Sequence, residues 1–196
     1  CDVIILAVKP NAVEQALKPC KALFDNSKIL VSIAAGVTIE KLKSITGKNS
    51  KVVRTMPNTP ALVGEGMTLV SPCKNTSDND TKTVLEIFKC VGRAQILKES
   101  LMNEVIAVSG SSPAYVFMFL EAMADAAVNL GIPRGMAYKL ASQSVLGAAK
   151  MVLETGQHPA VLKDQVCSPG GTTIEAVATL EEEGFSNAVI KAMKKC

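Results

Sequence analysis

Residues 168–173 read SPGGTT and combine a tight turn with two hydroxyl side chains, directly before the helix-patterned run IEAVATLEEE. Two adjacent glycines leave the backbone uncovered, and free N–H groups at the start of a helix attract carboxylate or phosphate groups. One interpretation is therefore an anion site, with the Thr173 hydroxyl directed into the same space. The other is a plain turn and helix cap, because Thr172 and Glu175 have the spacing of a capping box.

Three further segments have a composition that suits ligand binding. VKP at 8–10, AAG at 34–36 and MPNTP at 56–60 each follow a strand-like run. In open α/β sheets, ligands bind beyond the carboxyl ends of the strands, where small residues and prolines permit close backbone approach and a fixed loop shape. Any one of these segments could be an ordinary connection. Three of them at one sheet edge favour a ligand crevice.

Few side chains offer acid–base or nucleophilic chemistry. Lys9 could act in catalysis, although a lysine at a strand end is usually a solvated charge. His158, the one histidine, could act as a general acid, but its place before Pro159 and beyond a predicted helix end is typical of a turn. The six cysteines form no CxxC pair, so we expect no metal site. The lack of a nucleophile constellation suits chemistry that a bound cofactor supplies.

Strand and helix patterns alternate through the first half of the chain. We expect strands at 3–8, 28–33, 51–55, 67–71 and 93–97, and helices at 12–24, 39–46 and 77–91. Asn11 is the expected N-cap of the first helix. Such alternation predicts βαβ units and a mostly parallel sheet.

The second half of the chain is helical. Patterns at about 113–130 and 134–154 and two shorter ones after residue 172 follow the last strand, so we place a domain boundary between residues 98 and 99, which gives domains 1–98 and 99–196. The helix at 113–130 is apolar around most of its circumference. That predicts burial against another subunit.

The first strand pattern, VIILAV at 3–8, is apolar and β-branched throughout, which is typical of a central parallel strand buried on both faces. Because a central strand is an unusual first element and the chain opens on Cys1, we expect the sequence to be truncated at its N-terminus.

Composition narrows the classes of partner and compartment. Aromatic residues make up 4% of the chain, the net charge is +3 and no Lys/Arg stripe occurs, so we do not expect a nucleic-acid partner. The longest apolar run, 114–130, contains Glu121 and Asp125 and is interpreted as a buried helix rather than a membrane span. Scattered cysteines suggest reduced thiols in the cytoplasm.

Taken together, the motifs resemble those of pyrroline-5-carboxylate reductases. AVKP, SIAAGVTIEKL, RTMPNTPALVGEGMT, SGSSPAYVF, GIPRGMA and HPAVLKDQVCSPGGTTIEAV occur in the order expected of that family, across essentially the whole chain. The resemblance implies a Rossmann-type α/β domain followed by an all-α dimerisation domain, and a cytoplasmic homodimer or larger homo-oligomer. It also implies hydride transfer from NADPH or NADH to the C=N bond of 1-pyrroline-5-carboxylate, which yields L-proline in the last step of proline biosynthesis.

Two features depart from the family pattern. The Gly-rich phosphate turn is absent, so we expect the first βαβ portion to be missing, and with it the residue that distinguishes NADPH from NADH. Ser112 stands where the family usually has the second glycine of SGSGP. A serine is tolerable there only if the backbone does not need a positive φ.

The resemblance also implies roles for individual residues. A largely backbone-lined site for the nicotinamide-ribose end of the cofactor would comprise Ala7, Val8, Lys9, Pro10, Ile33, Ala34 and Ala35, with Gln165 contacting cofactor from the helical domain. The substrate would meet Ser168, Gly171, Thr172 and Thr173, and Thr173 would act in catalysis through a hydrogen bond to the ring nitrogen. Glu99 corresponds to a position near the substrate, although it could equally be a surface charge in a linker.

Two other functions remain open at this point. A hydroxyacid-dehydrogenase-like NAD(P) oxidoreductase has the same Rossmann-plus-helices layout, but it would need a lysine in the helical domain as proton donor. Without its phosphate turn, the chain could also be an inactive oligomerisation fragment; an upstream strand followed by GxGxxG or GxGxxA would restore the enzyme interpretation.

Overall fold

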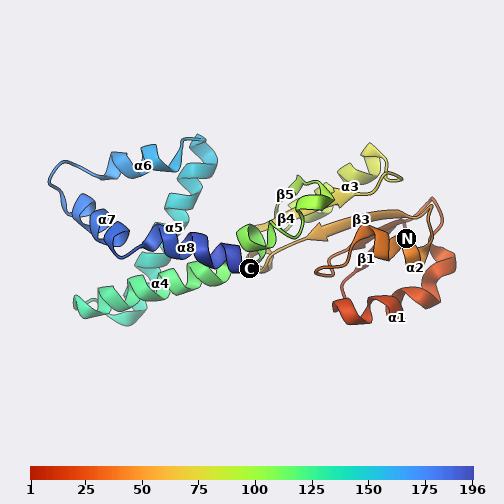
Figure 1. Cartoon of the computed structure of the whole chain (residues 1–196), viewed down its shortest axis with the longest axis horizontal. Helices are drawn as coiled ribbons and strands as arrows, with labels where there is room; N and C mark the ends of the chain where they lie inside the picture. The colour runs from red at the N-terminus through yellow and green to blue at the C-terminus, as the bar shows by residue number, and fades with distance from the viewer. The chain divides into compact units, whose positions relative to one another are not determined.

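The computed structural model describes residues 1–196, which form two compact units, Cys1–Pro113 and Ala114–Cys196 (Figure 1). The first unit contains the sheet and the second contains only helices. Residues 99–113 group with the sheet.

The first unit is built on a five-stranded sheet. Its strands, in spatial as well as chain order, are β1 (Val3–Leu6), β2 (Ile29–Ser32), β3 (Lys51–Met56), β4 (Gly66–Pro72) and β5 (Gly92–Ile96). The pairs β1–β2, β2–β3 and β4–β5 are parallel, and only β3–β4 is antiparallel. The mostly parallel sheet predicted from the alternation is confirmed.

Helices cover both faces of this sheet, which explains why apolar residues on both sides of its inner strands are buried. Successive residues of β2 point to opposite faces, so Leu30 belongs to one core cluster while Ile29 and Val31 belong to another. The first cluster includes residues of α1 (Val13–Leu17) and α2 (Ile39–Thr46). The second includes Val84 and Phe88 of α3 (Asp78–Lys89). A doubly covered parallel sheet of this kind is the α/β architecture predicted.

The first strand differs from its prediction. β1 ends at Leu6 instead of Val8, it lies at an edge of the sheet, and Ile5 is 49% exposed. Within residues 1–196 it is therefore not a central strand buried on both faces. Although β1 is apolar throughout, it pairs with one strand only, β2.

The predicted helix at 12–24 is broken into three short pieces. They are the 3-10 turn η1 (Pro10–Ala12), α1 and the 3-10 turn η2 (Lys18–Leu23). Asn11 as the N-cap was wrong: Pro10 opens η1 with Asn11 inside it, and Ala12 is the residue before α1. Pro19 lacks the N–H that would continue an α-helical ladder, so the chain tightens into η2.

Other helices of the first unit lie close to their predicted ranges, and three short ones were not predicted. α2 matches 39–46, and α3 begins after Ser77, whose side chain accepts from the Asp80 N–H in a reciprocal capping box. The unpredicted segments are the 3-10 turns η3 (Thr59–Val63) and η4 (Glu99–Leu101) and the π-helical turn η5 (Ile106–Gly110).

The all-helical part comprises α4 (Ser112–Asn129), α5 (Arg134–Thr155), α6 (Pro159–Val166), α7 (Thr172–Glu182) and α8 (Phe185–Lys195), coloured green to blue in Figure 1. Ser112 is tolerated because its φ is not positive: no residue other than glycine has a positive φ.

The helix α6 was not predicted. His158 is the N-cap of α6, and the His158 Nδ1 accepts from the Ala160 N–H at 3.2 Å. This histidine therefore caps a helix at the end of the turn in which it was expected.

The second unit buries very little of its apolar surface within one chain. Its fully buried hydrophobic residues are three alanines, Ala124, Ala137 and Ala141, whereas Phe117 is 63% and Met118 is 69% exposed. The helical stretch Ile106–Asn129 is long and apolar enough to cross a membrane by length and composition alone. Apolar side chains left in water on this scale require a cover from outside the chain.

Candidate active site

The three loops singled out in the sequence leave the sheet at the same edge. β1, β2 and β3 are mutually parallel, so residues 7–10, 33–38 and 57–60 all follow the carboxyl ends of their strands. This is the edge at which open α/β sheets bind ligands. The third loop is anchored by Asn58, whose Oδ1 accepts from the Met67 N–H at 2.8 Å and whose Nδ2 donates to the Ser109 carbonyl at 3.0 Å.

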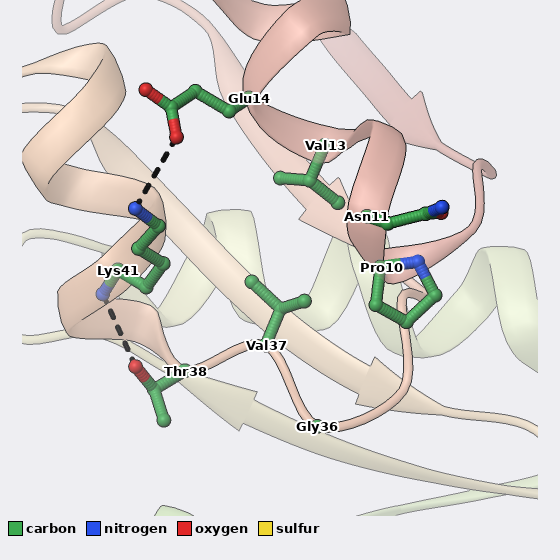
Figure 2. Close-up of a pocket in the computed structure, with 8 residues that line it drawn as sticks. All are labelled: Pro10, Asn11, Val13, Glu14, Gly36, Val37, Thr38 and Lys41. Carbon is green, nitrogen blue, oxygen red and sulfur yellow. Dashed lines mark hydrogen bonds and ion pairs between the residues drawn. The ribbon is translucent and has the colours of Figure 1, made fainter.

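A pocket of about 330 Å³ lies where the loops after β1 and β2 meet α1 and α2. Figure 2 shows its lining: Pro10, Asn11, Val13, Glu14, Gly36, Val37, Thr38 and Lys41. Glu14 Oε2 and Lys41 Nζ lie 3.5 Å apart at its rim. The pKa of Glu14 is lowered, above all by the hydrogen bond from Lys18 and then by the charges of Lys18 and Lys41. The pocket therefore has an apolar floor and an ion-paired rim.

The residues predicted to line the cofactor site fall into two groups. Residues 7–10 are exposed and follow β1, with the Lys9 carbonyl accepting from the Ala12 N–H at 2.9 Å. In the second group, the Ile33 N–H donates to the Leu6 carbonyl at 3.1 Å, which ties the start of the second loop to the end of β1. Ala34 is buried and Ala35 is exposed. Only Pro10 is also part of the pocket lining.

These two loops fit the nicotinamide-ribose end of a dinucleotide. The exposed residues Ala7, Ala35 and Gly36 have small side chains or none. A Cβ at Gly36 would meet no atom within 4 Å, so the loop after β2 is open to an approaching ligand. Residues 1–196 contain no Gly-rich turn of the kind that holds the pyrophosphate. The fit therefore concerns one end of the cofactor.

The SPGGTT turn adopts a shape that depends on both of its glycines. Gly170 has a φ of +65°, a region that favours glycine. A Cβ on Gly171 would collide with the Ser168 Oγ and lie 3.1 Å from the Ser168 carbonyl oxygen. The Gly171 N–H donates back to that carbonyl at 3.0 Å. The turn folds tightly onto Ser168.

The predicted capping box at the start of α7 was wrong. Gly171, with extended backbone, is the N-cap, and the helix begins at Thr172 without any side-chain cap. The reason is the hydrogen bond from the Glu175 N–H to the Gly171 carbonyl, which places the first helical turn one residue earlier than expected. Thr172 and Thr173 are consequently the first two helical residues, and both side chains are exposed.

An uncapped helix start of this kind is a set of donors that point at solvent. The first N–H groups of a helix have no acceptor within it, and their partial positive charge favours an anion. No side chain of the chain fills this place at α7. The arrangement can receive a carboxylate, with the Thr173 hydroxyl beside it.

The two remaining predicted site residues are engaged within their own units. Glu99 Oε1 accepts from the Ile39 N–H at 2.7 Å and lies 3.5 Å from Arg54 Nη1. Gln165 is exposed and its Nε2 donates to Gln157 Oε1 at 3.2 Å. Glu99 is therefore a bonded part of the sheet unit and not an isolated surface charge.

Sequence reasoning missed Arg54 and its partners. Arg54 lies on β3, is 4% exposed, and donates to Asn103 Oδ1 at 3.0 Å as well as approaching Glu99. A charged residue inside the apolar run KVVRT was the available signal, because buried charges need partners. No group of three or more His, Cys, Asp or Glu side chains is placed to hold a metal ion.

Comparison with known proteins gives consistent similarities. A family model described as pyrroline-5-carboxylate reductase dimerisation matches residues 99–196. The pyrroline-5-carboxylate reductase of Escherichia coli is 56% identical over 195 residues, which are all of this chain and 72% of that protein. The Arabidopsis thaliana enzyme of the same name is 45% identical, over 99% of this chain and 71% of its own length.

Solved structures agree with the sequences. A pyrroline-5-carboxylate reductase from Coxiella burnetii superposes with a TM-score of 0.94 at 36% identity, covering all of this chain and 73% of that one. A pyrroline carboxylate reductase from Plasmodium falciparum, solved with NADP bound, superposes with a TM-score of 0.89 at 38% identity, over all of this chain and 74% of that one. The Rossmann-type fold with an all-α dimerisation domain is confirmed, and the chain belongs to the pyrroline-5-carboxylate reductase family.

Proposed function

We propose that this chain carries out the reduction of 1-pyrroline-5-carboxylate to L-proline with NADPH or NADH, the last step of proline biosynthesis. Membership of the reductase family supports the reaction. The observation that ties it to this chain is the start of α7, where an uncapped helix N-terminus and an exposed Thr173 follow a turn shaped by two glycines.

The substrate carboxylate is bound by the main-chain N–H groups at the start of α7. These groups lack acceptors in the chain, and the helix dipole adds to their attraction for a negative charge. Gly171 lets the backbone approach the ligand, and Ser168 and Thr172 supply hydroxyls at the edge of the same turn. Binding by backbone donors fixes the orientation of the ring.

Thr173 is the catalytic residue of this proposal. Its hydroxyl forms a hydrogen bond with the ring nitrogen as hydride reaches the adjacent carbon. A hydroxyl fixed on the first turn of a helix needs little reorganisation during the reaction, and a hydrogen bond aimed at an atom on which charge develops is stronger in the transition state.

The cofactor is held at its nicotinamide-ribose end by residues 7–10 and 33–35, with Gln165 as a contact from the helical part. NADPH or NADH, when bound, supplies the hydride. The chain itself positions the C=N carbon and excludes water. The loops at the sheet edge allow this because their backbone can approach the ligand closely. The NADP bound to the Plasmodium relative supports the cofactor with a 2′-phosphate, NADPH, for this chain.

The proposed assembly is a homodimer or larger homo-oligomer formed through residues 99–196, the range matched by the dimerisation model. For the same reason we propose 98/99 as the boundary between the cofactor-binding and dimerisation parts. The exposed apolar side chains of α4, together with the match to the dimerisation model, support burial of this helix by a second copy. No disulfide joins any of the six cysteines, in keeping with a cytoplasmic location.

The direct test is a steady-state assay of the complete gene product with 1-pyrroline-5-carboxylate and, separately, NADPH and NADH. Formation of proline with equimolar cofactor oxidation is the expected result. A 2-oxo acid, which a hydroxyacid dehydrogenase would reduce with the same cofactors, serves as the control substrate and should leave NADPH and NADH unoxidised. Absence of proline from correctly folded, oligomeric protein would overturn the proposal.

A further inference from the structure

Glu99 joins two segments that are distant in the sequence. It lies in the short turn η4, yet its Oε1 accepts from the N–H of Ile39, 60 residues earlier, at 2.7 Å. Ile39 is the first residue of α2, and helix-start N–H groups have no acceptor within their own helix. Glu99 therefore supplies an acceptor that residues 34–38 cannot supply for themselves.

The carboxylate of Glu99 is held from the other side by a buried cation. Arg54 Nη1 lies 3.5 Å from the same Oε1, and Arg54 Nη2 donates to Asn103 Oδ1 at 3.0 Å. Arg54 is almost fully buried on β3, where an unpaired guanidinium would be strongly unfavourable. The same Oε1 of Glu99 therefore serves both the Arg54 guanidinium and the Ile39 N–H.

The loop that this contact anchors is the one after β2. Within it the Val37 N–H donates to the Ala34 carbonyl, and Thr38 Oγ1 accepts from the Lys41 N–H at 3.1 Å. Gly36 has a φ of +72°, and a Cβ added to it would meet no atom within 4 Å. The turn is consequently held at its two ends, by Ala34 and by the start of α2, while its centre is open.

We infer that Glu99 is a positioning residue for the cofactor: it holds residues 34–38 in the conformation that receives the nicotinamide-ribose end, and does not itself contact the substrate. This inference rests on the proposed function. It predicts that Glu99 acts through the length of its side chain, which must reach Ile39, more than through its charge.

Two conservative variants separate reach from charge. Glu99→Gln keeps an oxygen within reach of the Ile39 N–H but removes the charge that faces Arg54, whereas Glu99→Asp keeps the charge and withdraws the oxygen by one methylene. We expect Glu99→Asp to weaken NADPH binding about tenfold and Glu99→Gln to change it less than about threefold. The measurement is NADPH titration by calorimetry on the complete gene product, without substrate.

Amide exchange provides a readout at the contact itself. The Ile39 amide should exchange faster in Glu99→Asp than in the unmodified protein, while amides of β2 and β3 keep their protection. Ser77→Ala is the matched control, because it removes a helix cap from α3 in the same unit without touching residues 34–38. It should lower the melting temperature and leave NADPH affinity unchanged.

Three outcomes would overturn the inference. Unchanged NADPH affinity in Glu99→Asp together with a raised KM for 1-pyrroline-5-carboxylate would make Glu99 a substrate contact. A lowered melting temperature with both constants unchanged would make it merely structural. Loss of affinity in Glu99→Gln but not in Glu99→Asp would make the charge the essential feature. Turnover by the unmodified protein tests the proposed function separately, so the two failures are distinguishable.

Discussion

At the scale of single residues, the position at which α7 begins leaves two neighbouring threonines without a capping role. Thr172 and Thr173 are both exposed at the start of α7, and Gly171 occupies the N-cap position that would have given Thr172 a structural task. Neither hydroxyl caps the helix. Both are available to a ligand, and the proposed chemistry depends on Thr173.

Thr173→Ala should reduce turnover by about ten- to several-hundred-fold, the range for a hydrogen bond that strengthens in the transition state. The melting temperature should hardly change, because no helix cap is lost. Steady-state kinetics and thermal melts on the complete gene product measure both quantities. Thr172→Ala should also leave stability almost unchanged, and its turnover shows whether the loss is specific to Thr173. Wild-type turnover in Thr173→Ala would assign the motif to substrate binding alone.

Gly171→Ala should impair substrate binding through shape. The added methyl group collides with Ser168 Oγ and crowds the Ser168 carbonyl, although the backbone φ of −83° is ordinary for alanine. We expect the KM for 1-pyrroline-5-carboxylate to rise about tenfold as the turn opens, measured by steady-state kinetics. Adding Ser168→Ala removes the side-chain collision and should restore part of the affinity. No recovery would place the effect on the carbonyl contact.

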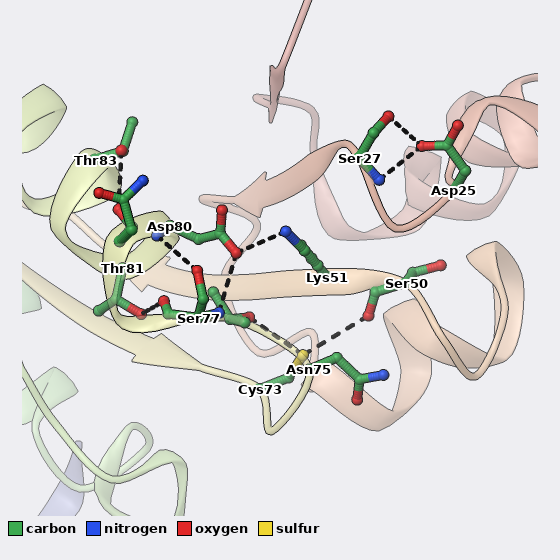
Figure 3. Close-up of polar contacts among 12 residues, drawn as sticks. Asp25, Ser27, Ser50, Lys51, Cys73, Asn75, Ser77, Asp80, Thr81 and Thr83 are labelled. Atoms are coloured by element: carbon green, nitrogen blue, oxygen red, sulfur yellow. Dashed lines mark hydrogen bonds and ion pairs between the residues drawn. The ribbon is translucent and has the colours of Figure 1, made fainter.

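At the scale of elements, α3 shows how a helix start is tied to a strand. Figure 3 shows Asp80 between Ser77 and Lys51: the Asp80 carboxylate accepts from the Ser77 N–H at 3.0 Å and from Lys51 Nζ at 2.8 Å. Lys51 begins β3, so the capping box also fixes α3 against the sheet. Ser77→Ala should lower the free energy of unfolding by about 1 kcal/mol, measured by urea denaturation. An unchanged midpoint would mean that Asp80 holds the helix without Ser77.

The same carboxylate predicts an acid-sensitive stability. The hydrogen bond from Lys51, and then those from Ser77, hold the pKa of Asp80 below its ordinary value despite the opposing effect of burial. A carboxyl group whose pKa is lower in the folded state stabilises the fold above the unfolded pKa of about 4, and this contribution disappears as the pH falls below that value. Urea midpoints between pH 6 and pH 3 should therefore fall less steeply in Asp80→Asn. Parallel curves would exclude this contribution.

At the scale of the whole molecule, one copy of the chain cannot cover its own helical surface. The large exposed side chains of α4 and α5 contrast with the tightly packed clusters on both faces of the sheet. Dimerisation of residues 99–196 would bury that surface, which is where the hydrophobic contribution to the stability of this part must arise.

Phe117→Glu should shift the protein toward monomer, because a carboxylate buried between two copies is strongly unfavourable. Analytical ultracentrifugation at micromolar concentration measures the change. Lys74→Glu, an exposed substitution in the sheet unit, is the control and should leave the assembly intact. An unchanged oligomer in Phe117→Glu would exclude this surface of α4 as the interface, and recovery of the wild-type protein only in detergent would favour a lipid-facing helix instead.

Much of the molecule follows from local sequence. Strand runs such as KILVSI and the pattern of α2 and α3 specify their elements because apolar periodicity and turn residues act over a few neighbouring positions. The motifs AVKP, SIAAGV and SPGGTT were sufficient to indicate the family.

Tertiary structure decided what depends on distant partners or on one hydrogen bond among competing ones. Helix α7 begins at Thr172 with Gly171 as cap because of where the Glu175 N–H finds its acceptor, and Asn11 lost its capping role to the turn that Pro10 starts. Glu99 could be interpreted only as a surface charge or a substrate contact until β3 and α2 were packed beside it. Such contacts join residues that are far apart in the chain. Packing alone selects them, because the local sequence carries no information about which buried charge or free N–H group a side chain will face.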